Sequence, residues 1–325
     1  MKRHRKVPFL HVAVDLPKMD IFLQQIINGL VQGSIYALVA LGYTMVYGIM
    51  GLINFAHGEV VMIGTLVTIT VATTLIKAGM PVAVAGLAGL SSAVLACMAL
   101  GWSLERVAYR PLRNAPRLTP LITAIGMSIV LQNLAMIIWG RNYLTFPPLL
   151  PKMDFEFAGA NFTLVQVVIV LVSAATMGGL LFLVYRTKLG MAMRATSQNP
   201  AVASLMGVNI NRVIAAAFVI GSALGAVAGV MVGTYYEIAH YQMGFMLGLK
   251  AFTAAVLGGI GNLAGAMLGG VLLGLIEALG AGYIGDLTGG FLGSHYQDIF
   301  AFVVLIVVLM FKPSGLFGEK TGDRA

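Results

Sequence analysis

The stretch RTKLGMAMRATSQNPAVASLMGVNINR, residues Arg186–Arg212, lies between two long apolar runs and is the most informative part of the chain. Within it, Asn199 can cap a helix, Pro200 suits a first helical turn, and Gly207 can end the helix in a left-handed conformation. The stretch therefore predicts a short, capped helix on one face of a membrane protein. Such a helix offers a surface for another protein to grip; an ordinary interfacial loop helix is the alternative.

The composition places the chain in a membrane. Of its 325 residues, 59% are hydrophobic and 10% are charged, and the mean hydropathy is +0.92. A soluble domain carries about 25% charged residues, so this chain could not cover its surface in water. The net charge of +8 lies mainly in loops and termini, where it faces lipid headgroups. No basic face interleaved with aromatic residues indicates nucleic-acid binding.

Apolar runs long enough to cross the hydrocarbon core, about 20 residues, recur along the whole chain. They are Ile21–Gly58, Val60–Ile76, Val82–Gly101, Leu118–Gly140, Thr163–Tyr185, Val213–Tyr236, Ala251–Ile276 and Thr288–Phe311. The first is too long for one ordinary span, and Gly42, Gly48 and Gly51 offer places to divide it. We expect an all-α, polytopic membrane helical bundle with about 8–10 transmembrane segments, some broken or re-entrant.

Basic residues orient these runs, because cytoplasmic loops are enriched in Lys and Arg. The loop Glu105–Arg117 carries four arginines and is expected on the cytoplasmic side, together with Arg186–Arg212 and the C-terminal tail. The mixed or acidic loops are expected outside, namely Arg141–Asn161, Glu237–His240 and Asp286–Asp298. The expected organisation is a cytoplasmic N-terminal extension (1–20), a transmembrane domain (21–312) with the loop 186–212, and a cytoplasmic tail (313–325).

A glycine-rich segment, GGIGNLAGAMLGG (Gly258–Gly270), interrupts one apolar run. In hydrocarbon, freed backbone groups need partners from protein or water, so a broken helix lies against a bundle or a cavity. Close helix packing through small residues is the alternative for any single glycine. The cluster as a whole favours a break.

Polar residues within or beside the apolar runs are costly and often functional. Asn54, His57 and Glu59 lie together and could line a translocation path or cap a half-helix, and Asn262 falls in the glycine-rich break. A more conservative interpretation is that His57 and Glu59 mark a membrane–water boundary.

Three further polar residues interrupt spans. Glu277 predicts either an ion-pair partner or a position near the external boundary. Gln132 and Asn133 predict hydrogen bonds between helices.

Catalysis and metal binding have little support in the sequence. No HExxH, GxSxG or CxxC motif occurs, and no GxxxxGK[ST] loop that would let the chain hydrolyse ATP by itself. The single cysteine, Cys97, cannot form an intrachain disulfide, and the 19 methionines follow no repeated spacing. We therefore expect neither an enzyme nor a resident metal or cofactor.

Four motifs together resemble one family. NGLVQGSIYALVALGYTMVYGIMGLINFAHGEVVMIG (Asn28–Gly64), GMAMRATSQNPAVASLMGVN (Gly190–Asn209), AFTAAVLGGIGNLAGAMLGG (Ala251–Gly270) and FKPSGLFG (Phe311–Gly318) occur in this order. They are similar to the branched-chain amino acid permease subunits of bacterial ABC importers, more closely to those of the Liv-type H kind. The resemblance covers about residues 20–318 and leaves the first 19 residues out.

The resemblance implies a multi-pass subunit of the bacterial inner (plasma) membrane, surrounded by lipid, that translocates Leu, Ile and Val. A periplasmic binding protein would deliver the amino acid, a homologous second permease would complete the path, and two ATPase subunits would use ATP and Mg. The family's ATPase-contacting loop falls on seven positions of this chain: Gly190, Arg194, Ala195, Asn199, Pro200, Ala201 and Gly207. This segment is then the expected coupling helix.

Other functions remain open at this stage. Permeases for urea, short-chain amides or other amino acids look alike, so the cargo is undecided. So is the second permease, either a paralogue or an identical copy. A self-sufficient secondary transporter or channel would need no ATPase, but it would usually show a clearer charged site inside the membrane.

Overall fold

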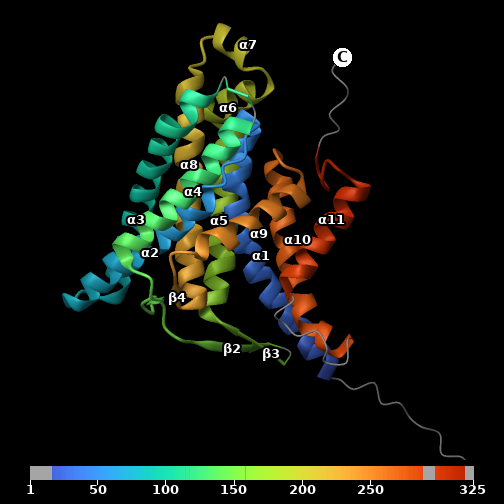
Figure 1. Cartoon of the computed structure of the whole chain (residues 1–325). Helices are drawn as coiled ribbons and strands as arrows, with labels where there is room; N and C mark the ends of the chain where they lie inside the picture. The colour runs from blue at the N-terminus through green and yellow to red at the C-terminus, as the bar shows by residue number, and fades with distance from the viewer. Residues whose placement is uncertain (1–16, 114, 117, 158, 288–296, 319–325) are drawn as a thin grey trace, which may run out of the picture.

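Long apolar helices run side by side through the molecule (Figure 1). The computed structural model describes residues 17–113, 115–116, 118–157, 159–287 and 297–318. The helices are α1 (Pro17–Met50), α2 (His57–Lys77), α3 (Val82–Leu104), α4 (Leu118–Trp139), α5 (Leu164–Arg186), α6 (Lys188–Gln198), α7 (Pro200–Leu205), α8 (Ile210–Tyr236), α9 (Met243–Gly258), α10 (Leu263–Leu287) and α11 (Gln297–Phe311). Expectations for residues 1–16, for residues 288–296 and for residues beyond 318 lie outside the described residues.

Short elements complete the fold. A π-helical turn, η1 (Glu105–Tyr109), and a 3-10 turn, η2 (Arg110–Leu112), extend α3. Strand β1 (Leu144–Thr145) pairs antiparallel with β4 (Ile238–Ala239), and β2 (Asp154–Phe157) pairs antiparallel with β3 (Ala160–Thr163).

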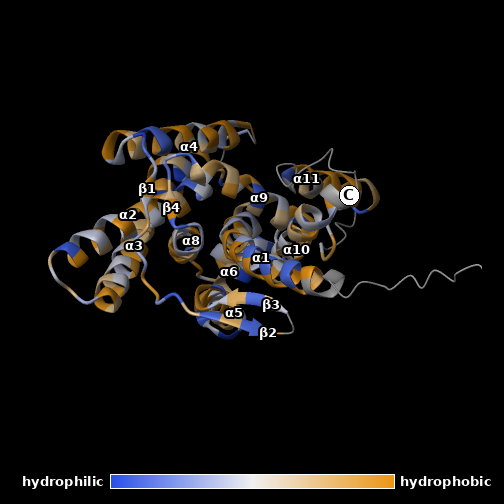
Figure 2. Cartoon of the chain, turned by 90° about the horizontal axis from the view of Figure 1, so that it is seen from below, coloured by the Kyte–Doolittle hydropathy of each residue, from blue (hydrophilic) through white to orange (hydrophobic). Residues whose placement is uncertain are grey.

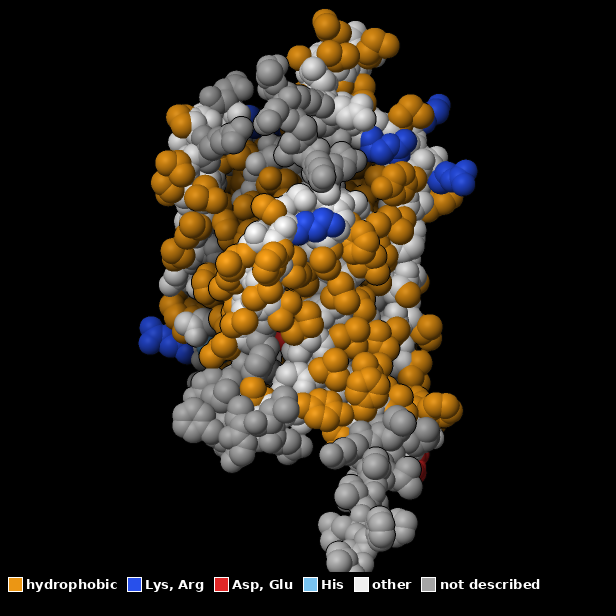
Figure 3. Space-filling model, turned by 90° about the vertical axis from the view of Figure 1, so that its right-hand side faces the viewer, with side chains coloured by type: hydrophobic (Ala, Val, Ile, Leu, Met, Phe, Trp, Pro, Cys, Tyr) orange, Lys and Arg blue, Asp and Glu red, His pale blue; other side chains and the backbone are white. Residues whose placement is uncertain are grey.

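The multi-pass helical fold expected from the sequence is confirmed. Within the described residues, seven helices are long and apolar enough to cross a membrane, and α9 and the Ala301–Phe311 part of α11 are shorter apolar helices. Hydrophobic side chains cover most of the middle of the face shown in Figure 3, as expected for a surface in contact with lipid.

The bundle has two distinct ends, which we call the α7 end and the hairpin end (Figure 1). At the α7 end, Arg113 Nη1 donates to Asn211 Oδ1 at 2.5 Å, so the loop after α3 meets the beginning of α8. At the hairpin end, β1 pairs with β4, and β2 pairs with β3. The described loops thus group as the basic and acidic residues indicate.

The beginning of α1 differs from expectation. The backbone N–H of Asn161, in β3, donates to Gln24 Oε1 at 2.9 Å, which places the first turns of α1 at the hairpin end. The first described turns of α1 therefore lie at the end opposite Arg186–Arg212, and the expectation for the extension before Pro17 lies outside the described residues. The reason is that α1 crosses once: Gly51 (φ +65°) ends it, whereas Gly42 and Gly48 lie inside it.

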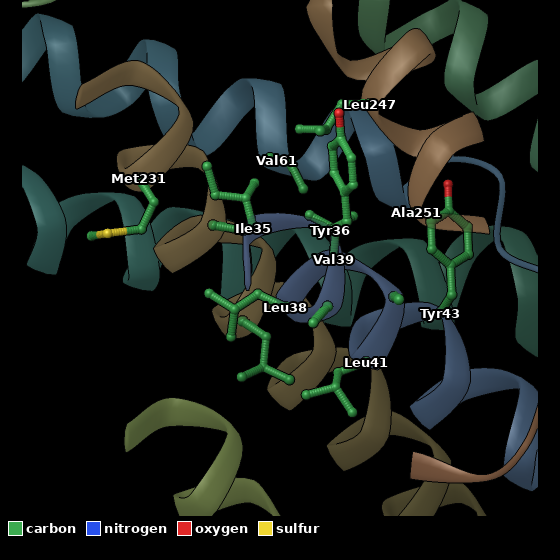
Figure 4. Packing of buried hydrophobic residues seen from close by; sticks show 14 of the residues in the cluster. Ile35, Tyr36, Leu38, Val39, Leu41, Tyr43, Val61, Met231, Leu247 and Ala251 are labelled. Carbon is green, nitrogen blue, oxygen red and sulfur yellow. The ribbon is translucent and has the colours of Figure 1, made fainter. Parts of the chain in front are cut away.

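Small residues let α1 pack tightly in the centre of the bundle. A side chain on Gly33 would lie 2.7 Å from the Cα of Val271 in α10. Close backbone approach of this kind drives helix association where lipid removes the hydrophobic driving force. Figure 4 shows the residues of α1 between Ile35 and Tyr43 facing α2, α8 and α9 at Val61, Met231 and Ala251.

The glycine-rich segment contains a break. α9 ends at Gly258 and α10 begins at Leu263, with Gly259 (φ +107°) and Gly261 (φ +96°) between them. The freed carbonyl oxygens of Leu257 and Gly258 accept hydrogen bonds from the N–H groups of Leu316 (2.9 Å) and Phe317 (3.0 Å). The segment thus combines a helix break at Gly259 and Gly261 with close helix packing further on, where Gly269 and Gly270 pack against Ala254 and Ala37.

Candidate coupling segment and transport site

The Arg186–Arg212 stretch forms a capped helix where the sequence predicts one. Asn199 precedes α7, and its Oδ1 accepts a hydrogen bond from the N–H of Val202 at 3.1 Å. Pro200 is the first residue of α7, and Gly207 follows its end with φ +86°. The predicted start, first turn and left-handed end are all confirmed.

A second helix in the stretch, α6, escaped the sequence reasoning. Thr187 caps it by accepting from the N–H of Gly190 at 3.1 Å, a threonine signal that could have revealed this helix. A side chain on Gly190 would collide with the carbonyl oxygens of Leu183 and Val184 at the end of α5. Arg194 donates to the same Val184 oxygen and lies over the ring of Tyr185. α6 is therefore fastened to the end of α5.

The seven positions of the expected coupling segment thus divide into two groups. Gly190 and Arg194 attach α6 to α5, and the carbonyl oxygen of Ala195 accepts from the N–H of Asn199. The exposed positions belong to α7 and its ends: Asn199, Pro200, Ala201 and Gly207.

The tip of α7 also presents large apolar side chains that the sequence reasoning did not single out. Val202 is 52% exposed, Leu205 is 87% exposed and Met206 is 80% exposed. The outward hydrophobic side chains at the top of Figure 3 lie where Figure 1 places α7.

Asn54, His57 and Glu59 lie together inside the bundle. Asn54 Oδ1 accepts from the hydroxyl of Tyr109 at 2.7 Å, and Asn54 O accepts from the N–H of His57 at 3.0 Å. A side chain on Gly42 would collide with the His57 ring, which also faces Gly225 near the middle of α8. The loop after α1 therefore turns inward, and α2 begins at mid-depth.

Glu59 is fully buried in the first turn of α2. Its Oε1 accepts hydrogen bonds from Ser128 Oγ (3.0 Å) and Gln132 Nε2 (2.9 Å), both in α4. Its Oε2 makes no hydrogen bond with any described residue and lies against the backbone of Gly244, at the beginning of α9. The interpretation of Glu59 and His57 as boundary residues is wrong, because they are 0% and 2% exposed in the bundle interior.

Asn262 has a different position and role. Its Oδ1 accepts from the N–H of Gly265 at 3.0 Å, which caps α10, and its Nδ2 donates to the carbonyl oxygen of Phe317 at 3.0 Å. The structure does not bring Asn262 to the group around Glu59. Its contacts hold the break and the C-terminal segment together.

Gln132 and Asn133 behave differently from each other. The interhelical hydrogen bond expected of Gln132 is confirmed by its contact with Glu59. That expectation is wrong for Asn133, whose Nδ2 donates to the carbonyl oxygen of Ile129 in the same helix.

Glu277 has the ion-pair partner that was one of its two expected roles. Its Oε2 accepts from Lys250 Nζ (3.2 Å) and from the hydroxyl of Tyr36 (2.8 Å), while Lys250 Nζ also lies 2.6 Å from Asp298 Oδ1. This cluster joins α1, α9, α10 and α11. Lys250 was missed because it bounds an apolar run in the sequence.

A second charged cluster stands at the α7 end. Buried Glu105 pairs with Arg110 at 2.9 Å and also with Arg113. Burial lowers the pKa of the Arg113 guanidinium, and the charge of Glu105 opposes that shift. Because Arg113 also binds Asn211, this cluster joins the turn after α3 to α8.

Comparisons with known proteins agree with this architecture. Residues 25–309 match the family described as "Branched-chain amino acid transport system / permease component". The high-affinity branched-chain amino acid transport system permease protein BraD of Pseudomonas aeruginosa is 47% identical over 95% of this chain and 100% of its own length. LivH of Escherichia coli, which bears the same description, is 46% identical over 93% of this chain and 97% of its own length.

A more distant relative, the probable branched-chain amino acid transport permease protein LivH of Methanocaldococcus jannaschii, is 27% identical over 94% of this chain and 96% of its own length. These relatives are transport permeases, and the span-capable helices agree with a multi-pass protein of the inner membrane. The family match covers most of the chain, and two relatives exceed 45% identity over nearly all of it. This chain belongs to the branched-chain amino acid transport system permease family.

Proposed function

We propose that this chain is a permease subunit of an ABC importer that translocates branched-chain amino acids. It works with a second, homologous permease and two ATPase subunits that bind ATP and Mg, and a periplasmic binding protein delivers the amino acid. The observation that carries the proposal is the α6–α7 segment, two capped helices at the α7 end with an apolar tip. The near full-length similarity to permeases named for branched-chain amino acids supports the cargo.

The apolar tip of α7 is the ATPase contact in this proposal. Leu205 and Met206 are more than three-quarters exposed at an end that is also rich in arginine. Contiguous exposed apolar patches mark protein–protein or membrane interaction sites. A groove on the ATPase that accepts these side chains would hold α7.

The caps at both ends of α7 keep this helix rigid. The hydrogen bond from the N–H of Val202 to Asn199 Oδ1 closes the first turn of α7, and Gly207 closes its end without strain. When nucleotide closes the ATPases, α7 moves, and α6 carries the motion to α5. The bundle then changes between outward-open and inward-open states.

The path for the amino acid runs past Asn54, His57 and Glu59 at mid-depth, where broken helices of transporters commonly place their substrates.

Figure 2 shows α4 at one edge of the bundle, with α5 at the opposite edge. The α4 edge, beside α9, exposes Ile129 (55%) and Phe245 (51%). The second permease would cover this edge and enclose the path.

Reconstitution of the full complex tests the proposal. Proteoliposomes with both permeases, the ATPases and the binding protein should accumulate leucine only with ATP, and this chain alone should accumulate none. Gly207→Val and Asn199→Leu should uncouple ATP hydrolysis from uptake while membrane insertion stays normal.

Gly79→Val is the matched control. Gly79 has φ +85°, nearly the same as Gly207 at +86°, and both have open space where a side chain would stand. Gly79 follows α2, away from α7, so equal backbone strain there should leave coupling intact. Normal uptake by the Gly207 and Asn199 variants would refute the coupling role, and ATP-independent uptake by this chain alone would refute the importer.

A further inference from the structure

A cavity of about 430 Å³ lies between α4 and α9 at mid-depth. Small-molecule sites span about 300–1,000 Å³, so one amino acid fits within it. Ser128, near the middle of α4, and Gln132 form part of its wall beside Tyr43 and Gln242, and the remaining lining is apolar. The cavity is therefore an apolar groove whose wall carries one strip of polar side chains.

Glu59 orients the Ser128 and Gln132 side chains of this polar strip by hydrogen bonds on the side away from the cavity. Ser128 and Gln132 both donate to Glu59 Oε1, so the Ser128 hydroxyl hydrogen and one amide hydrogen of Gln132 point away from the cavity. The atoms left for a ligand are then the lone pairs of Ser128 Oγ, the carbonyl oxygen of Gln132 and the second amide hydrogen of Gln132, so the two acceptors on this wall are oxygens. Such acceptor oxygens, backed by a buried carboxyl group, complement a primary ammonium.

The opposite wall suits the rest of an α-amino acid. Gln242 precedes α9, and its side chain makes no capping hydrogen bond to that helix, so its amide can donate to a carboxylate. The first turn of α9 adds the positive end of the helix dipole. Ile125, Ile129 and Leu249 line the apolar part and suit a branched aliphatic side chain.

We propose that this cavity is a transit site for one zwitterionic, branched-chain amino acid, with its ammonium at Ser128 and Gln132 and its side chain on the apolar wall. Glu59 acts as a positioning residue, because it orients the two donors without lining the cavity. This inference rests on the proposed function and adds residues to it.

Uptake by the reconstituted complex tests the ammonium contact. Gln132→Leu should lower leucine uptake at saturating binding protein by about tenfold or more, since a hydrogen bond to a charged group is lost. Asn133→Leu is the matched control, because Asn133 is the next residue of α4 and, among the described residues, its side chain hydrogen-bonds to its own helix. If Gln132→Leu transports as well as Asn133→Leu, the inference fails while the importer stands.

Thiol labelling tests the cavity independently of transport. In the full-length chain with Cys97→Ala, Leu249→Cys should react at least about fivefold faster with a cationic aminoethyl thiosulfonate than with the anionic sulfonatoethyl reagent of similar size. Leucine should slow both reactions, and Glu59→Gln or Gln132→Leu should remove the preference. Equal rates for the two reagents, or no protection by leucine, would overturn the proposal even if the complex imports leucine normally.

Discussion

Replacing Lys250 with methionine should cause a large loss of stability. The Glu277 side chain is fully buried and Lys250 is 13% exposed, with 3.2 Å between Nζ and Oε2. At an effective dielectric constant of about 20, this separation corresponds to an attraction of about 5 kcal/mol. Removing one partner of a buried pair costs about 3–5 kcal/mol, because the other charge stays buried without compensation. Asp298 also loses its partner in this variant, because its buried Oδ1 lies 2.6 Å from Lys250 Nζ.

SDS-induced unfolding of the purified chain in mixed micelles measures the effect. Lys250→Met should lower the free energy of unfolding by about 3–5 kcal/mol. Adding Glu277→Gln should recover part of the loss, since glutamine carries no charge and can still accept from Tyr36, 2.8 Å away in this structure, while Asp298 stays without its cation. If Lys250→Met unfolds within about 0.5 kcal/mol of the parent chain, the pair does not hold these helices together.

Two further substitutions test the contacts around the broken helices. Gly244→Ala would place its Cβ 2.6 Å from Glu59 Oε2 and should cost about 1–3 kcal/mol in the same unfolding assay. Gly178→Ala, at a helical glycine with open space around it, should be neutral or stabilising, and an equal loss in both variants would disprove the clash. Asn262→Ala removes the cap of α10 and the contact with Phe317, and should cost about 1–2 kcal/mol and speed proteolysis of the C-terminal segment; unchanged proteolysis would contradict this.

Local signals in the sequence predicted much of the fold. The caps of α7 were predictable, because Asn199, Pro200 and Gly207 act within a few residues of one another. The division of the first apolar run was only partly predictable. A glycine that ends a helix, such as Gly51, and one that admits a neighbouring ring, such as Gly42, look the same in sequence.

Contacts between residues far apart in the sequence could not be predicted from such local signals. Glu59 meets Gln132, and Lys250 meets Glu277 across the break between α9 and α10. Periodicity gives each helix an inner face but does not tell which polar residues on two inner faces lie at the same depth. The start of α2 at mid-depth decided the partners of Glu59, and the inward turn of the preceding loop decided that position.

The short segment beside the end of α9 has consequences for how this sequence can vary. Leu316 and Phe317 reach Leu257 and Gly258 through main-chain atoms alone, and such bonds do not depend on which side chains are present. A substitution at 316 can therefore keep this hydrogen bond. Gly315, with φ +78° and no room for a Cβ beside the oxygen of Val256, has no such freedom.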